Sequence, residues 1–123
     1  IFKKSKLHSA TPRTSSFERD GQAFIALNGG PHYKHTPAVS FYIDCKDQRE
    51  VDYYWTRLLK GGRPSRCGWL QDKFGLSWQV VPQALGECLN GKDKDGAARA
   101  LAAMMKMVKL DAKKLKAAYQ VKR

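Results

Sequence analysis

Between residues 38 and 81 the chain changes its hydrophobic period twice, and this limits the folds open to it. Residues 38–44 alternate between strongly apolar and more mixed positions, as a strand does. Residues 51–58 place apolar side chains at helical spacing, and residues 66–71 and 76–81 again favour strands. The order is therefore strand, helix, strand, strand. It predicts a mixed α+β fold.

The helix in this segment has its own start and stop signals. Asp47 can cap the first turn, and Glu50, three residues later, can reach back. Gly61-Gly62 ends the helix because glycine adopts the left-handed conformation at no steric cost. Four apolar residues between these signals share one helical stripe: Val51, Tyr54, Trp55 and Leu58.

An Asp-Gly pair at residues 20–21 separates two earlier segments that are rich in strand formers, 14–19 and 22–28. This pair suits the tight turn of a hairpin. Both faces of the second segment are largely apolar, so we expect a central strand covered on both sides. A connector with glycine and proline at its ends follows, at residues 29–37.

The last third of the chain reads as helical. Pro82 closes the final strand, and helices are predicted over residues 83–89, 97–109 and 111–120. Residues 106–123 hold seven basic side chains and one acidic one. Because apolar residues interleave with these lysines, the pattern indicates solvated helix faces beside buried ones, and nucleic-acid binding is the less favoured interpretation.

The composition is that of one small globular domain. The 123 residues include 42% hydrophobic and 28% charged side chains and carry a net charge of +12. No apolar run is long enough to cross a bilayer, and no secretory signal is seen, so no membrane partner is expected. Cys45, Cys67 and Cys88 are spaced too widely for a disulfide framework or a paired-cysteine metal site. We expect reduced thiols and a cytoplasmic location.

Several stretches carry the motifs of a known family. The most specific is the run from Cys67 to Pro82, which reads CGWLQDKFGLSWQVVP. The others are shorter: 26–31, 40–45, 50–52 with Trp55, and 104–111. With these motifs the chain resembles the 3-demethylubiquinone 3-methyltransferase-like family. That family belongs to the glyoxalase, bleomycin-resistance and extradiol-dioxygenase superfamily, also named vicinal oxygen chelate.

This resemblance implies a glyoxalase-like fold, in which paired βαβββ modules form a curled sheet with a cleft, usually in a homodimer. One domain would span residues 1–123. Its parts would be the remainder of the first module (1–31), the connector (32–37), the second module (38–81) and C-terminal helices (82–123). The resemblance also implies an incomplete first module, because relatives carry a strand and a helix ahead of the point that matches Ile1.

Metal-dependent members of the superfamily place His, Glu or Gln ligands on strands that face the cleft. Here the matching positions fall near Ala38 or Ser40, at Gln79 and at Asn28. Amides and hydroxyls bind divalent ions weakly, so no metal and no other cofactor is predicted, with a retained divalent metal as the alternative. Neither Gly29-Gly30 nor Gly61-Gly62 has the context of a cofactor loop, so this sequence does not support the methyl transfer in the family's name.

The leading hypothesis is therefore a small-molecule-binding protein, enzymatic or sequestering, whose ligand stays unassigned. The superfamily implies that the cleft draws on one alternating set of each strand. These candidates are Phe24, Asn28, Ser40, Tyr42, Ser77 and Gln79. A metal-dependent lyase, isomerase or dioxygenase is the second hypothesis, and a nucleic-acid-associated module that uses the lysine-rich tail is the third. The three tryptophans are expected in the core.

Overall fold

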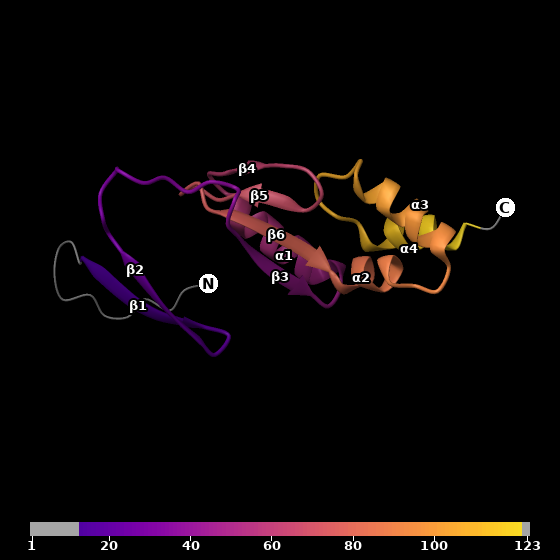
Figure 1. Ribbon diagram of the computed structural model, residues 1–123, viewed down its shortest axis with the longest axis horizontal. Helices are drawn as coiled ribbons and strands as arrows, with labels where there is room; N and C mark the ends of the chain where they lie inside the picture. Colours follow the sequence, from indigo (N-terminus) through magenta and orange to yellow (C-terminus); the bar gives the residue numbers. More distant parts are fainter. Residues whose placement is uncertain (1–12, 122–123) are drawn as a thin grey trace. The chain divides into compact units, whose positions relative to one another are not determined.

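The computed structural model describes residues 13–121. The chain forms two compact units, Ile1–Lys34 and His35–Arg123. The boundary falls inside the predicted connector, 32–37, and the single-domain organisation stays a prediction. Figure 1 labels the helices and strands of both units.

The first unit contains a β-hairpin. β1 (Thr14–Arg19) pairs antiparallel with β2 (Gln22–Leu27). Asp20 and Gly21 between them both have positive φ, 50° and 76°, as a tight hairpin turn of this kind requires. The predicted hairpin is confirmed. The expected cover over both faces of the second strand is wrong, because Ile25 and Leu27 are 76% and 73% exposed and the sheet has only two strands among the described residues.

The second unit contains a four-stranded sheet and a helix in the order that the sequence predicts. Its elements are β3 (Ser40–Cys45), α1 (Gln48–Leu59), β4 (Arg63–Pro64), β5 (Trp69–Gln71) and β6 (Ser77–Pro82). The strands lie in the order β3-β6-β5-β4, with β3 parallel to β6 and the other neighbours antiparallel (Figure 1). This is the βαβββ module that the resemblance implies.

The segment before β5 differs from the prediction. Residues 66–71 were expected to form one strand, but Cys67 and Gly68 have positive φ, 58° and 82°, which interrupts strand pairing. The turn lets the N–H groups of Cys67 and Gly68 donate to the carbonyls of Met107 and Val108, each over 2.8 Å. The two-residue strand β4 was not predicted, because so short a segment carries no periodicity. The first strand of the module also begins at Ser40 rather than at residue 38.

Both ends of α1 form as predicted. The Asp47 carboxylate accepts a hydrogen bond from the Glu50 N–H over 3.0 Å, and the Glu50 carboxylate accepts one from the Lys46 N–H over 2.9 Å. Gly61, with φ of 78°, follows the helix end. The apolar stripe packs on one face of the sheet and forms a core of these buried residues: Ile43, Cys45, Val51, Trp55, Leu70, Trp78 and Val80.

A single carboxylate organises the turn between β5 and β6. Asp72 accepts hydrogen bonds from the N–H groups of Phe74 and Leu76, over 2.8 and 3.1 Å. Its second oxygen accepts from the indole N–H of Trp78 over 3.0 Å. These bonds fix where β6 begins, and therefore which of its side chains face away from α1.

Three helices complete the second unit: α2 (Gln83–Leu89), α3 (Lys94–Met104) and α4 (Ala112–Gln120). Figure 1 shows them gathered beyond one end of the four-stranded sheet. They enclose a second small core of Val81, Leu85, Leu110 and Leu115. The sequence predicts α3, the second of these three helices, over residues 97–109. It begins earlier because Asp93 caps it, and it ends at Met104 because the following residues run beside Cys67 and Gly68.

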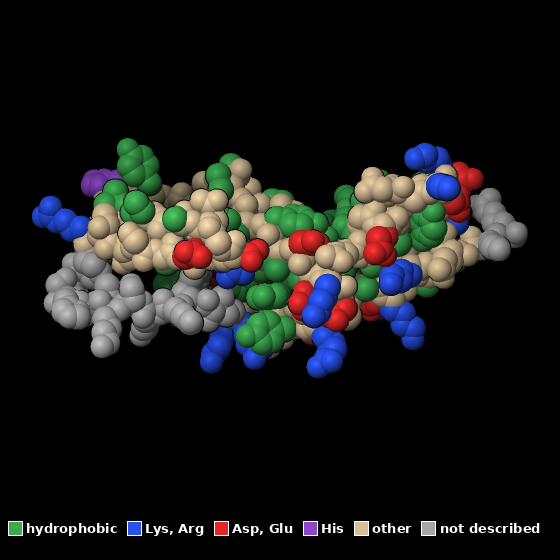
Figure 2. All heavy atoms as spheres, turned by 90° about the horizontal axis from the view of Figure 1, so that it is seen from below, with side chains coloured by type: hydrophobic (Ala, Val, Ile, Leu, Met, Phe, Trp, Pro, Cys, Tyr) green, Lys and Arg blue, Asp and Glu red, His purple; other side chains and the backbone are tan. Residues whose placement is uncertain are grey.

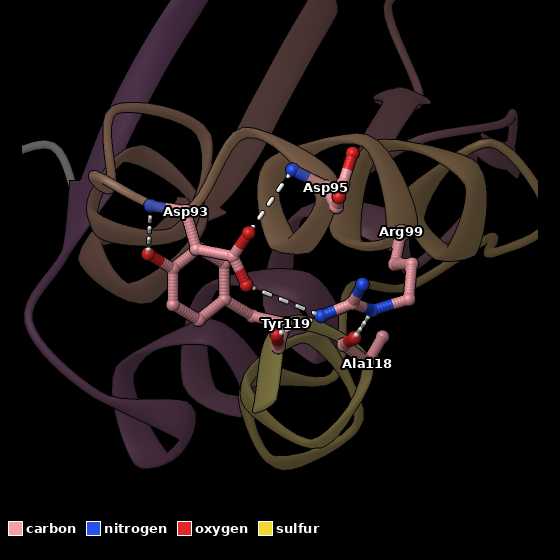
Figure 3. Close-up of polar contacts among 5 residues, drawn as sticks. All are labelled: Asp93, Asp95, Arg99, Ala118 and Tyr119. Atoms are coloured by element: carbon pink, nitrogen blue, oxygen red, sulfur yellow. Dashed lines mark hydrogen bonds and ion pairs between the residues drawn. The ribbon is translucent and has the colours of Figure 1, made fainter. Parts of the chain in front are cut away.

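One arginine ties α3 to the end of α4. The Arg99 guanidinium donates to the carbonyl oxygens of Ala118 and Tyr119, over 3.0 and 2.8 Å, as Figure 3 shows. It also lies 3.4 Å from the Asp93 carboxylate. The Tyr119 hydroxyl accepts from the Asp93 N–H over 3.2 Å. Carbonyls at a helix end lack partners within the helix, so this arginine satisfies two that would otherwise depend on water.

The lysine-rich tail forms the two-sided helix that its pattern indicates. Leu115 is fully buried, whereas Lys113, Lys114 and Lys116 on the same helix are exposed. On the face shown in Figure 2, Lys and Arg side chains stand among Asp and Glu side chains instead of forming one basic patch. Within residues 13–121, no helix has the length and apolar character needed to span a membrane.

Candidate functional site

The face of the four-stranded sheet that points away from α1 carries polar side chains in two rows. Residues paired across neighbouring strands share a face. The register aligns Ser40, Ser77, Gln71 and Arg63 in the first row across all four strands. It aligns Tyr42, Gln79 and Trp69 in the second row across three strands. The four cleft candidates predicted for this module therefore lie side by side on one face.

Two of these candidates bind each other. The side-chain amide of Gln79 donates a hydrogen bond to the Ser40 hydroxyl over 2.9 Å, between the parallel strands β6 and β3. The bond holds the Gln79 side chain across the sheet. Both side chains are partly buried, so each is shielded from water and still within reach of a bound molecule.

The Ser77 hydroxyl is the exception among the buried polar groups. Ser77 is 1% exposed, and its oxygen is the one buried side-chain polar atom without a hydrogen-bond partner in the described part of the chain. An unpaired buried hydroxyl costs about 1–3 kcal/mol of stability. A group of this kind in a folded protein calls for an explanation, and a bound water or ligand is one.

Ser77 is one of the residues that line a cavity of about 180 Å³. Ser77 and residues from β4, β5 and their flanking loops line it: Pro37, Arg63, Pro64, Ser65, Trp69, Leu70 and Gln71. The cavity lies entirely within the second unit. It lies at the edge formed by β4 and β5, and of the four candidates in this module only Ser77 lines it.

Tyr42 is the most accessible of the four candidates in this unit, with 58% of its surface exposed. Partial burial raises the pKa of its phenol, and the carboxylate of Asp44 adds to the effect. The hydroxyl therefore stays neutral near pH 7 and can both donate and accept a hydrogen bond.

The remaining two candidates, Phe24 and Asn28, belong to the first unit. The Phe24 ring stacks on the Phe17 ring with centroids 5.4 Å apart, and the Asn28 N–H donates to the Arg13 carbonyl over 2.7 Å. Their part in the site stays a prediction.

Of the eight residues that line the cavity, all except Ser77 were not predicted as site residues, and three of them matter most: Trp69, Gln71 and Arg63. Trp69 was expected in the core, and this is wrong: Trp55 and Trp78 are 7% and 3% exposed, whereas Trp69 is half-buried on the opposite face. The spacing of Trp69 and Gln71 already puts both on one strand face, so the signal was present. Arg63 had no such signal, because it follows the glycines that end α1.

The donor atoms on this face do not fit a tightly held divalent metal. Ser40, Ser77 and Gln79 offer two hydroxyls and an amide, and divalent ions prefer carboxylates and imidazoles to such neutral groups. Among residues 13–121, no three His, Cys, Asp or Glu side chains come together as a metal site would require.

The glycine pairs do not fit a nucleotide-type cofactor either. Gly61-Gly62 lies between α1 and β4, not between a strand and the helix that follows it. A Cβ atom at Gly62 would overlap the Gln71 carbonyl oxygen, so the missing side chain serves close packing against β5. Gly29-Gly30 lies between β2 and β3.

Comparisons with known proteins agree on family and fold. The family model described as 3-demethylubiquinone-9 3-methyltransferase matches residues 2–81. A solved structure of the PhnB protein from Bacillus cereus, titled a putative 3-demethylubiquinone-9 3-methyltransferase, is similar at 23% identity, with a TM-score of 0.54. The similarity covers 67% of this chain and 76% of that one. No curated protein matches the chain.

Proposed function

The chain belongs to the 3-demethylubiquinone-9 3-methyltransferase family, and from this premise we propose that it binds a small organic molecule on the polar face of β3-β6-β5-β4. One observation carries the proposal. Ser77 is one of the residues that line the cavity, and its buried hydroxyl has no partner among the described residues. A ligand that enters the cavity can bind this hydroxyl and remove the cost of leaving it unpaired.

The neighbouring side chains support the same function. Gln79 and Ser40 form a pre-organised polar pair on the same face, and Trp69 offers a flat apolar surface. Small-ligand sites combine apolar walls with a few well-placed polar groups, as this face does. The ligand would be held by hydrogen bonds and burial, without a metal.

The proposal covers binding and leaves methyl transfer out, although the family's name contains that reaction. Methyl transfer needs a site for the methyl donor, and neither glycine pair has the strand–loop–helix context of such a site. Calorimetry with S-adenosylmethionine tests this part directly. We expect no heat of binding, and saturable binding would show that methyl transfer belongs in the account.

A ligand-observed NMR screen of small organic fragments tests the binding function. The variant is Ser77→Ala, which removes one hydroxyl, and the control is Thr56→Val, which changes an exposed residue of α1 on the other side of the sheet. We expect fragments that bind wild type and Thr56→Val equally and Ser77→Ala about 2–10-fold more weakly, because one neutral hydrogen bond is lost. Fragments that bind all three proteins alike, or no binding to wild type, would overturn the proposal.

The metal-dependent alternative makes a different prediction. Protein purified without chelators should contain well under one divalent ion per chain by elemental analysis, because amides and hydroxyls hold such ions weakly. A full equivalent that survives dialysis would favour the alternative.

The homodimer implied by the resemblance also stays a prediction. Light scattering on the purified protein should give about twice the chain mass of 13.9 kDa. A mass of one chain at all accessible concentrations would contradict it.

A further inference from the structure

The charge and size of the cavity at the β4–β5 edge narrow the class of ligand. We infer that it takes a small carboxylate with a flat apolar body, of the size of a simple aromatic acid. This inference rests on the proposed binding function and adds the ligand's charge and shape to it.

Arg63 determines the charge of the expected ligand. Among the eight described residues that line the cavity, it is the only one with a formal charge. No carboxylate of residues 13–121 forms an ion pair with it, whereas Arg99, Lys46 and Lys109 each have an acidic partner. A guanidinium binds a carboxylate through two parallel hydrogen bonds, and these charge-assisted bonds are the strong ones.

Alongside Arg63, Ser77 and Gln71 provide neutral polar side chains. They lie in the same row of the sheet as Arg63, on β6 and β5. The unpaired Ser77 hydroxyl can donate to a carboxylate oxygen, an acceptor that an ammonium ligand lacks. The net charge of +12 favours an anion in addition, because the field of the whole protein attracts it.

The walls and the volume set the shape. Pro37, Pro64 and Trp69 contribute apolar surface, and an indole is a good platform for a flat ring. The cavity holds about 180 Å³, and an apolar cavity of ~150 Å³ in another protein is known to accept benzene. It is smaller than the ~300–1,000 Å³ of a site for drug-sized ligands. One ring with a carboxylate fits these limits.

Benzoate and benzamide form the matched pair of probes for a test. They have nearly the same size and shape, but only benzoate is charged. Affinities would be measured by titration in two-dimensional NMR, with the Trp69 indole signal as the local reporter, assigned by Trp69→Phe. The variant is Arg63→Gln, and the control is Arg66→Gln, which removes an exposed arginine outside the cavity lining.

We expect benzoate to bind wild type about 10-fold more tightly than benzamide, since a charge-assisted pair is lost with the amide. Arg63→Gln should remove that difference, and Arg66→Gln should keep it. Raising the salt concentration should weaken the binding of benzoate and leave the binding of benzamide unchanged.

Two results would overturn the inference in distinguishable ways. Equal affinity of both probes for wild type, or an unchanged benzoate preference in Arg63→Gln, would contradict the anionic ligand and leave the binding function standing. Absence of any shift at the Trp69 signal with both probes, together with an empty fragment screen, would remove the inference and the binding function at once.

Discussion

The side-chain amide of Gln79 donates to the hydroxyl of Ser40 over 2.9 Å, across the two parallel strands at the β3–β6 junction. The bond satisfies two polar groups on a face that α1 does not cover. Ser77 lies opposite Ser40 in the same register, and its hydroxyl has no such partner among the described residues. This face of the sheet thus contains a satisfied polar pair, which joins the two rows, and an unsatisfied hydroxyl on a residue that lines a cavity.

A double-mutant cycle measures the satisfied pair. Gln79→Leu and Ser40→Ala should each lower the free energy of unfolding, and the coupling between them should be about 0.5–1.5 kcal/mol, the range for a partly buried neutral hydrogen bond. The exposed pair Gln83 and Asp44, whose atoms are 3.2 Å apart, is the control. Its coupling should be smaller, because water replaces the lost partner. Equal coupling in the two pairs would contradict the shielding of this face.

Ser77→Ala, in contrast to these substitutions, should not lower the free energy of unfolding. Removing a buried hydroxyl that has no partner should leave the free energy of unfolding unchanged or raise it by about 1 kcal/mol, while it weakens ligand binding. Urea denaturation of the ligand-free protein measures this. A loss of more than about 1 kcal/mol would mean that the hydroxyl is already satisfied, and the main argument for a ligand would fall.

We expect the buried Cys45 thiol to make the protein lose stability in alkaline solution. Burial, and next the Glu50 carboxylate, raise the pKa of this fully buried thiol from 9.0 to about 11. The folded state therefore holds the proton more tightly than the unfolded state. This contribution is complete below pH 9 and is lost as the pH rises towards 11.

Wild type should lose on the order of 2 kcal/mol more than Cys45→Val between pH 8 and pH 10.5. Denaturant titrations at the two pH values measure the difference. Cys67→Ser, at a half-buried position, is the control and should keep the wild-type dependence. The same alkaline loss in Cys45→Val would assign the effect to other groups.

Arg99 should contribute through its fork of hydrogen bonds more than through its charge. Arg99→Lys keeps the charge but does not reproduce the paired bonds to the Ala118 and Tyr119 carbonyls, so we expect a loss of about 1–3 kcal/mol. Asp93→Asn removes the ion pair but keeps a capping side chain. It should cost much less than Arg99→Lys, because the Asp93 and Arg99 side chains are 52% and 33% exposed and water screens their ion pair. Thermal unfolding of both variants measures the two losses of stability. A larger loss for Asp93→Asn than for Arg99→Lys would contradict this interpretation.

Much of the fold follows from local signals in the sequence. Asp20-Gly21, the Asp47 cap and the Gly61 stop are decided by backbone conformation and nearby hydrogen bonds, and each is predicted at its residue. The ends of α3 are not, because Met107 and Val108 bond to a distant turn at Cys67 and Gly68. No local pattern reports such a contact.

The candidate site, like the fold, was predictable from the sequence only in part. Alternation along β3 is enough to put Ser40 and Tyr42 on one strand face, and alternation along β6 does the same for Ser77 and Gln79. Trp69 and Arg63 join them only through the register of β5 and β4, which is a property of the whole sheet. Sequence periodicity shows which side chains share a strand face, and pairing decides which strands lie together.

The most direct test of the central claim is a map of where a small ligand binds. Fragments found in the screen would be titrated into ¹⁵N-labelled protein while backbone and side-chain signals are followed. The account predicts saturable shifts at Ser77, Gln79, Trp69 and Gln71, with little change along the exposed side of α1. Saturable shifts on α1 or on the C-terminal helices, with the signals of β5 and β6 unmoved, would contradict it.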